Sequence, residues 1–415
     1  MNIWIFNHYA ITPDLPGGTR HYDFAKELVK RGHEVAIFAS GFSYLQHKEL
    51  KLASKEKFKV ENVGGVNFVW IKTFPYQSND WRRIINMVSY MNQAYWLGRK
   101  ISNLNRGVSK PDIIIGSSVH LLAVLTAYQL SKYHKAEFVM EVRDLWPQTL
   151  VDMGRYKENN LIIKILRCLE VYLYARAKKI IVLLPLLQEY ITSLKVKQSK
   201  IAWIPNGVDL ERFKYFEQKA DTSKFKVMYL GAHGEANALN TIIDAAKITQ
   251  DRGYKNIKYI LIGDGSKKKE LIARKNKLNI ETVDFCPAVE KNYVSDVLHL
   301  ADSLVFHLKK TEVFKYGISS NKLFDYMMSG KPLIFAVNTE GNLIKEVKNG
   351  ISIPPENPEL MAEAVIKLYQ MSPGEREAMG QKGSEYVKKY HNISVLVDKL
   401  EGVIKEVIGE KVGSN

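Results

Sequence analysis

Three glycine-containing loops, each following a short apolar run, are the first candidates for chemistry. They are residues 12–18 with Gly17 and Gly18, residues 231–234 with Gly231, His233 and Gly234, and residues 263–265 with Gly263 and Asp264. Glycine lets a backbone approach a ligand closely, and a helix that starts after such a loop presents N–H groups to an anion. The three loops favour a phosphate-bearing ligand, although each alone also fits ordinary turn chemistry.

Residues 316–334 carry the strongest single pattern, a helix start with capping groups, a lysine and a carboxylate, followed by a Gly-Lys-Pro stop. The capping candidates are Ser319, Ser320 and Asn321. Lys322 at the helix start suits a diphosphate, and Asp325 just beyond it suits a pair of sugar hydroxyls. The alternative is an ordinary capped helix with a solvated lysine and aspartate.

These loops and helix starts belong to two series of alternating strands and helices. Strands at 2–6 and 34–40 with a helix at 20–31 form a βαβ unit, which 112–116, 121–132 and 138–142 repeat. A second series has strands at 226–230, 258–262, 282–285, 303–308 and 332–336, and a helix at 239–251. This pattern predicts an α/β protein with two Rossmann-like domains, 1–203 and 204–391. The last helical stretch, 395–407, fits either domain, and we assign 392–415 to the first.

Composition sets the limits on partners. The chain has 415 residues and a formal net charge of +16, which favours phosphates in nucleic acid, anionic lipid or a small molecule. We expect no nucleic-acid partner, because no helix-turn-helix, zinc or RNP-like signature is present. The first residues show no signal peptide, and charged residues interrupt the most apolar region, 161–184, so we expect no membrane span.

The order and spacing of these motifs resemble the family 4 glycosyltransferases of the GT-B fold over nearly the whole chain. The resemblance rests on Gly17-Gly18, on 141–147 (Glu-Val-Arg-Asp-Leu-Trp-Pro), on 204–209 (Ile-Pro-Asn-Gly-Val-Asp), on 263–265, and on 321–327 with 330–332. It is greatest to the bacterial branch that includes L-fucosamine transferases of O-antigen and capsule synthesis.

The resemblance implies roles for residues on both sides of a cleft between two domains. The C-terminal domain would hold a UDP-sugar, with Asp325 on the ribose and the backbone of Asn321, Lys322 and Leu323 and of Gly17 and Gly18 at the diphosphate. The loops at 231–234 and 263–265 would complete the donor site. His120 would lie beside the transferred sugar, and Arg143 and Asp144 would contact the sugar or the acceptor.

Two departures from the family pattern concern the donor. The family has an acidic pair, and Asp325 fits its second member, but Gly317 occupies the first position; Glu312 could substitute only through a different loop path. The family also places Arg and Lys where this chain has Ala232 and Asn237. The diphosphate must then rely on backbone amides, Lys322 or another basic residue.

The chain contains no Asp-x-Asp motif, which metal-dependent glycosyltransferases commonly use. We therefore expect a hexosyltransferase without metal or other cofactor, in which helix dipoles and lysine stabilise the departing diphosphate. The resemblance implies retention of configuration, and no side-chain nucleophile is evident. A nucleotide-sugar epimerase, a catalytically inactive partner subunit and a nucleic-acid-binding protein remain the alternatives.

Residues 81–95 read as a helix with an apolar stripe beginning at Trp81 and basic neighbours that include Arg82 and Arg83. Such a helix fits the interface of an anionic membrane, and equally a helix packed on its own domain. In the family reading the acceptor is a lipid-linked saccharide. We therefore expect a cytoplasmic protein, peripheral on the inner face of the cytoplasmic membrane.

Overall fold

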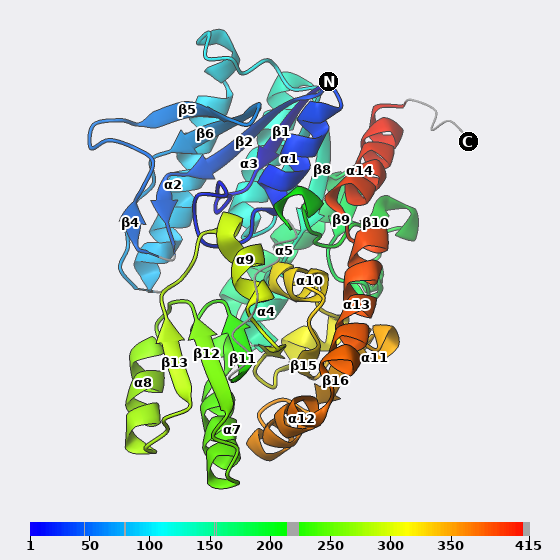
Figure 1. Ribbon diagram of the computed structural model, residues 1–415. Coiled ribbons are helices and arrows are strands. Elements are labelled where there is room, and N and C mark those ends of the chain that lie inside the picture. Colours follow the sequence, from blue (N-terminus) through cyan, green and yellow to red (C-terminus); the bar gives the residue numbers. More distant parts are fainter. Residues whose placement is uncertain (45, 79, 153, 155, 214–223, 410–415) are drawn as a thin grey trace. The chain divides into compact units, whose positions relative to one another are not determined.

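The computed structural model describes residues 1–44, 46–78, 80–152, 154, 156–213 and 224–409 (Figure 1). The chain forms two compact units. The N-terminal unit contains residues 1–12, 18–205 and 393 onward, and the C-terminal unit contains residues 13–17 and 206–392. The sequence placed the main boundaries two residues and one residue earlier, at 203/204 and 391/392.

The N-terminal unit is built on an eight-stranded sheet in the order β10-β9-β8-β7-β1-β2-β6-β5. All its strands pair in parallel except β5, which is antiparallel to β6. The strands are β1 (Asn2–Phe6), β2 (Glu34–Ser40), β5 (Phe58–Val63), β6 (Val66–Ile71), β7 (Ile113–Ser117), β8 (Glu137–Val142), β9 (Lys179–Val182) and β10 (Ile201–Trp203). A separate short pair joins β3 (Phe42–Ser43) to β4 (Lys48–Glu49).

Helices cover both faces of this sheet (Figure 1). The alternation of β1 sends Ile3 and Ile5 into a core with α1 and α14, while Trp4 and Phe6 face the other side, where the Trp4 ring meets His134 of α3. The helices are α1 (Arg20–Lys30), α2 (Trp81–Gly98), α3 (Leu121–His134), α4 (Gln148–Asp152), α5 (Leu161–Arg176), α6 (Leu187–Ser193) and α14 (Ile393–Ile408). The C-terminal helix α14 therefore belongs to the N-terminal unit, where Arg31 binds Asp398 and Glu401.

The C-terminal unit is a six-stranded parallel sheet in the order β13-β12-β11-β14-β15-β16. Its strands are β11 (Phe225–Leu230), β12 (Ile257–Ile262), β13 (Val283–Cys286), β14 (Ser303–His307), β15 (Leu333–Ala336) and β16 (Gly350–Ile353). Its helices are α7 (Asn240–Asp251), α8 (Lys268–Lys277), α9 (Val294–His299), α10 (Asn321–Met328), α11 (Leu343–Val347), α12 (Pro358–Gln370) and α13 (Pro373–Tyr390). One core packs α7, α8 and α12 on the sheet, and a second packs α9 and α10 on its other face.

Both units are thus doubly wound parallel sheets, as the sequence predicted. The strand and helix ranges named from the sequence agree with the structure to within two residues, except that α2 continues to Gly98. Start signals explain several boundaries: α12 begins with the Asn357 side chain accepting from the Leu360 N–H and with Pro358 in its first turn. Short strands rich in β-branched residues, buried on both faces, explain the continuous apolar runs.

Candidate functional site

The loops after β11 and β12 meet because these strands are parallel neighbours. The Gly231 N–H donates to the Ile262 carbonyl and the His233 N–H donates to the Asp264 carbonyl. A Cβ at Gly263 would lie 1.9 Å from the Gly231 oxygen, and one at Gly265 would lie 2.6 Å from the His233 oxygen. These two glycines are therefore required by the neighbouring loop, which corrects the reading that they make room for a ligand. Gly234 has open space where its Cβ would stand.

Lys322, at the start of α10, reaches under the first of these loops. Its Nζ donates to the Tyr229 hydroxyl at 3.1 Å and to the Asn237 side-chain oxygen at 3.0 Å, and it lies over the rings of Tyr229 and Phe306. Within the described part of the chain, no carboxylate lies within 4.0 Å of this ammonium. Burial lowers the pKa of Lys322 to about 7. The reading of a solvated lysine is therefore wrong, since this ammonium is partly buried without a counter-charge.

Asn237 stands where the family pattern has a lysine. Its side-chain oxygen accepts a hydrogen bond from the Lys322 ammonium of α10. The loop is fixed by His307, whose Nε2 accepts from the Glu356 N–H at 3.0 Å, so that Nδ1 carries the proton it donates to the Asn237 carbonyl at 2.8 Å. Burial lowers the pKa of His307 to about 4, which keeps it neutral.

His233 belongs to the loop after β11, and its side chain has no exposed surface. Neither ring nitrogen has a hydrogen-bond partner among the described residues. Burial, and next the nearby Lys268, lowers the pKa of His233 to about 4, so the ring is neutral at pH 7. Lys268 itself is used structurally, because its Nζ donates to the Gly263 and Cys286 carbonyls. Asp264 is exposed, and its side chain accepts from the Gly265 N–H of its own loop.

Asp325 lies three residues after Lys322 and forms an ion pair with Lys291, from the short helix η5 (Lys291–Tyr293). Both side chains are about nine-tenths buried, so the solvated aspartate of the alternative reading is also wrong. Leu323 is a core residue, and Asn321 is partly buried. No side chain caps α10.

The predicted capping role of the serines is not what the structure shows. The residue at the N-cap is Ser320, without a side-chain bond, whereas the Ser319 hydroxyl accepts from the Asn206 N–H. Gly317 has φ 101°, a backbone conformation that favours glycine and disfavours an acid at this position. The side chain of Glu312, the suggested substitute, lies outside the described part of the structure.

In the N-terminal unit, the segments after β1 and β7 bring two histidines together. His120 is the N-cap of α3, and its Nδ1 accepts from the Ala123 N–H at 3.2 Å. Its proton is therefore on Nε2, which donates to Nδ1 of His8 at 2.8 Å. The proton of neutral His8 is consequently on Nε2, a buried atom without a partner among the described residues. Burial lowers the pKa of His120 to about 3 and that of His8 well below its ordinary value.

Arg143 and Asp144 follow β8, next to this pair, since β7 and β8 are neighbours. The Arg143 N–H donates to the Ser118 hydroxyl, and Asp144 is exposed. Arg83 of α2 is partly buried and close enough to His8, His120 and Asp144 to affect their protonation. Trp81 and Arg82 are exposed on α2. Arg83 therefore lies near the histidine pair, whereas Trp81 and Arg82, with which the sequence grouped it, are exposed to solvent.

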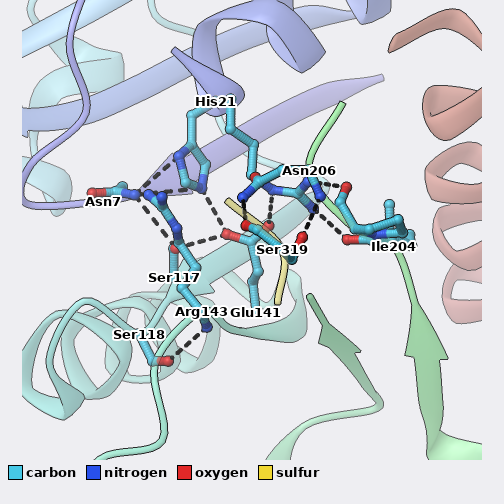
Figure 2. A network of polar contacts seen from close by, with 11 residues as sticks. Asn7, His21, Ser117, Ser118, Glu141, Arg143, Ile204, Asn206 and Ser319 are labelled. Atoms are coloured by element: carbon cyan, nitrogen blue, oxygen red, sulfur yellow. Dashed lines mark hydrogen bonds and ion pairs between the residues drawn. The ribbon is translucent and has the colours of Figure 1, made fainter. Parts of the chain in front are cut away.

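Glu141 lies two residues before Arg143 but is buried inside the N-terminal unit. Figure 2 shows its carboxylate in a network with His21 and Ser117, to which Asn7 also belongs. Glu141 Oε2 accepts from Ser117 and His21, both at 2.7 Å, and Oε1 accepts from Arg20 Nε at 2.8 Å. Burial alone would raise the pKa of Glu141, but the charge of Arg20 and the hydrogen bond with His21 lower it well below its ordinary value.

Arg20 also donates to the carbonyls of Ile204 and Pro205, at the last residues of the N-terminal unit before the chain enters the C-terminal one. Sequence reasoning missed this anchor, because Arg20, Glu141 and the carbonyls of Ile204 and Pro205 are far apart along the chain. Gly17 and Gly18, just before α1, are exposed, and Thr19 at the N-cap makes no side-chain cap bond. No group of three or more His, Cys, Asp or Glu that could hold a metal occurs within the described ranges.

Comparison with known proteins decides the class of this molecule. Residues 17–212 match the family described as Glycosyltransferase Family 4, and residues 224–371 match the one described as Glycosyl transferases group 1. The chain is a glycosyltransferase of the GT-B type. The relative "Probable glycosyltransferase WbjE" of Pseudomonas aeruginosa is 22% identical over 341 residues, which cover 76% of this chain and 80% of the relative. "Alpha-D-kanosaminyltransferase" of Streptomyces kanamyceticus is 24% identical over 183 residues, 44% of this chain and 45% of that protein.

Solved structures agree with this fold. Sucrose-phosphate synthase from Thermosynechococcus elongatus has a TM-score of 0.73 at 14% identity, covering 98% of this chain and 99% of that one. Anabaena HepE in complex with UDP and glucose has a TM-score of 0.69 at 14% identity, with coverage of 98% and 100%. WaaG, a glycosyltransferase involved in lipopolysaccharide biosynthesis, has a TM-score of 0.63 at 15% identity, with coverage of 97% and 99%. The GT-B prediction is confirmed, whereas the L-fucosamine branch stays a prediction.

Proposed function

We propose that this glycosyltransferase moves a hexosyl group from a UDP-sugar to a lipid-linked saccharide at the cytoplasmic face of the cytoplasmic membrane. By the resemblance of the sequence, the group is an N-acetylated amino sugar and the product a surface polysaccharide such as O-antigen or capsule. The transfer retains configuration and uses no metal or other cofactor. The relative HepE, whose structure holds UDP and glucose, supports a UDP-sugar donor.

One observation carries the donor site: the partly buried Lys322 ammonium with no carboxylate beside it in the described ranges. Its lowered pKa means that the unliganded site disfavours the charged form. A diphosphate placed beside it would supply the missing counter-charge and restore the charged form. In the proposal Lys322 then stabilises the charge of the departing UDP, which is the role a metal ion fills in other transferases.

Asp325 would hold the ribose. Its Oδ2 accepts from Lys291, and we assign Oδ1 to the ribose hydroxyls. Because Lys291 is largely buried with it, the pair fixes the carboxylate before the donor arrives, so that less conformational freedom is lost on binding. Gly17, Gly18, Gly234 and the start of α10 supply backbone N–H groups to the diphosphate, beside Gly231, whose own N–H is already bonded to the Ile262 carbonyl.

The acceptor side is assigned to the cluster at the carboxyl ends of β1, β7 and β8. Asp144 and Arg143 would contact the acceptor, and His120 would lie near the transferred sugar. Both ring nitrogens of His120 are already bonded, whereas His8 Nε2–H has no hydrogen-bond partner among the described residues. No residue of this cluster is given the role of a covalent nucleophile.

Isothermal titration with UDP, GDP and ADP in the presence of EDTA tests the proposal. We expect UDP alone to bind, without metal, and Lys322→Met to lose that binding. Lys345→Met is the matched control, since Lys345 is an exposed lysine on α11. Absence of binding by any of the three nucleotides would refute the donor site. Turnover of a UDP-sugar without any acceptor would instead identify an epimerase.

A further inference from the structure

Two helices of the N-terminal unit expose large apolar side chains to solvent. On α2 the exposed fractions are 61% for Trp81 and 60% for Trp96, with Ile84 also exposed. On α5 they are 71% for Leu161 and 59% for Ile165. The buried residues of α2, such as Met87 and Tyr90, lie on its opposite side. We call these two rows of exposed apolar side chains ridges. Their exposure to water is unfavourable, and such surfaces mark sites of contact.

The two ridges belong to one layer, because α3 lies between α2 and α5. The Thr126 hydroxyl of α3 donates to the Met91 carbonyl of α2, and Tyr128 of α3 meets the Tyr172 ring of α5 at a centroid distance of 5.8 Å. Near the other ends of α2 and α3, the Arg99 guanidinium lies over the Tyr133 ring. The three helices thus share one face of the sheet.

The charges of this layer have one sign. Neither α2 nor α3 contains an aspartate or glutamate, and the one carboxylate of α5, Glu170, has no exposed surface. Exposed cations occur on all three helices: Arg82 on α2, Lys132 on α3, and Lys164 and Arg176 on α5. Within these three helices, no carboxylate is therefore exposed to solvent.

We propose that the outer face of α2, α3 and α5 docks on an anionic lipid bilayer, with α5 as a second interfacial helix beside α2. Aliphatic and indole side chains enter the boundary between headgroups and acyl chains, while arginine and lysine meet lipid phosphates. In the described residues, no helix is long and apolar enough to cross a membrane. The inference rests on the proposed function and deepens it, since it names the surface on which a lipid-linked acceptor is met.

The composition of the face favours lipid over a protein partner. Its apolar residues are spread along separate helices among cations, whereas the core of a protein interface is depleted of charge. Its indoles stand beside guanidinium groups, as with Arg99 over Trp96 and Arg82 over Trp81. Tryptophan and arginine together are typical of residues at headgroup level.

Flotation of the full chain with lipid vesicles tests the proposal. We expect binding to vesicles of equal parts phosphatidylcholine and phosphatidylglycerol, and weaker binding to pure phosphatidylcholine or at high salt. Leu161→Glu with Ile165→Glu on α5 should weaken binding about tenfold or more, because the two apolar side chains are replaced by carboxylates that the lipid phosphates repel. Ile272→Glu is the control, since Ile272 is 36% exposed on α8 of the C-terminal unit.

UDP titration of the same variants separates this proposal from the proposed function. Lost vesicle binding with unchanged UDP binding is the expected result for the α5 variant. Vesicle binding that is equal in the wild type and the α5 variant would overturn the docking face and leave the donor site standing. Self-association that the α5 variant abolishes, with no vesicle binding, would identify a contact between copies and would also overturn it.

Discussion

Replacing Lys322 by methionine is expected to abolish UDP binding without destabilising the protein. Replacing a residue that supports the fold lowers the free energy of unfolding of the protein. Replacing a residue that serves only a ligand can raise the free energy of unfolding of the unliganded protein. Lys322 belongs to the second kind because its ammonium lacks a carboxylate in the described ranges and has only Asn237 and Tyr229 as hydrogen-bond partners. Methionine keeps the length and the apolar contacts of the side chain.

The magnitude follows from the pKa of this lysine. It falls from 10.5 to about 7 on burial, and each factor of ten in proton affinity corresponds to about 1.4 kcal/mol. At pH 7 the unfolded chain is fully protonated here and the folded one about half, so the ammonium costs the folded state at most about 4 kcal/mol. Solvent screening lowers this, because the residue is partly exposed. Methionine loses two hydrogen bonds worth about 1 kcal/mol each, so we expect a change between zero and a gain of about 2 kcal/mol.

The pH dependence gives the sharper assay. Between about pH 7 and 10.5 the unfolded chain binds the proton of Lys322 and the folded chain does not, so the wild type gains stability as pH rises through this window. Methionine does not titrate, so the stability of the variant lacks this dependence on pH. Urea unfolding of both proteins at several pH values should therefore show the advantage of Lys322→Met shrinking as pH rises. If the variant loses several kcal/mol at pH 7 and the difference does not change with pH, the reasoning is refuted.

Three further predictions concern other buried charges. Asp325→Asn should leave the Lys291 ammonium without its anion and cost about 3 kcal/mol in urea unfolding, whereas Asp325→Asn with Lys291→Met should recover most of that stability but not UDP binding; additive losses would contradict the pairing. Burial lowers the pKa of His233 and His307 to about 4 and that of His120 to about 3, so the unfolded chain takes up protons first and stability should fall as pH drops below about 6.5, by up to about 2 kcal/mol per histidine at pH 5; a flat profile would count against neutral buried histidines. Glu141→Gln should leave Arg20 without its carboxylate and lower the unfolding free energy by about 3 kcal/mol, and a melting temperature equal to that of the wild type would show that the network is dispensable.

The sequence predicted the elements well because buried parallel strands read as continuous β-branched runs and several helices, such as α1 and α10, are closely followed by glycine. It also located the segment around Lys322 and Asp325. It could not show that Asn237 holds the Lys322 ammonium, since 85 residues separate the two. The His8 and His120 pair spans 112 residues and has no local signal for the same reason.

Where the sequence was wrong, the cause was tertiary packing. Gly263 follows a strand and looks like a ligand loop, but the backbone of the adjacent loop occupies the space that its missing side chain leaves. Nor could the sequence show that Glu141, near the end of β8, is held inside the unit by the Arg20 guanidinium and a hydrogen bond with His21. A local sequence pattern shows which side chains are able to do chemistry. The order of the strands decides which of these side chains face a ligand and which pack against other groups of the protein.

The return of α14 to the N-terminal unit makes the C-terminal unit an insertion within the chain of the other. During synthesis, the strands of the N-terminal sheet are made before the C-terminal unit, but one face of that sheet waits for Leu396, Leu400 and Ile404, which follow the C-terminal unit in the chain. The C-terminal unit, from residue 206 to 392, is complete before them. The half of the protein that is translated first is therefore the half that finishes folding last, and until then it exposes an uncovered apolar sheet face.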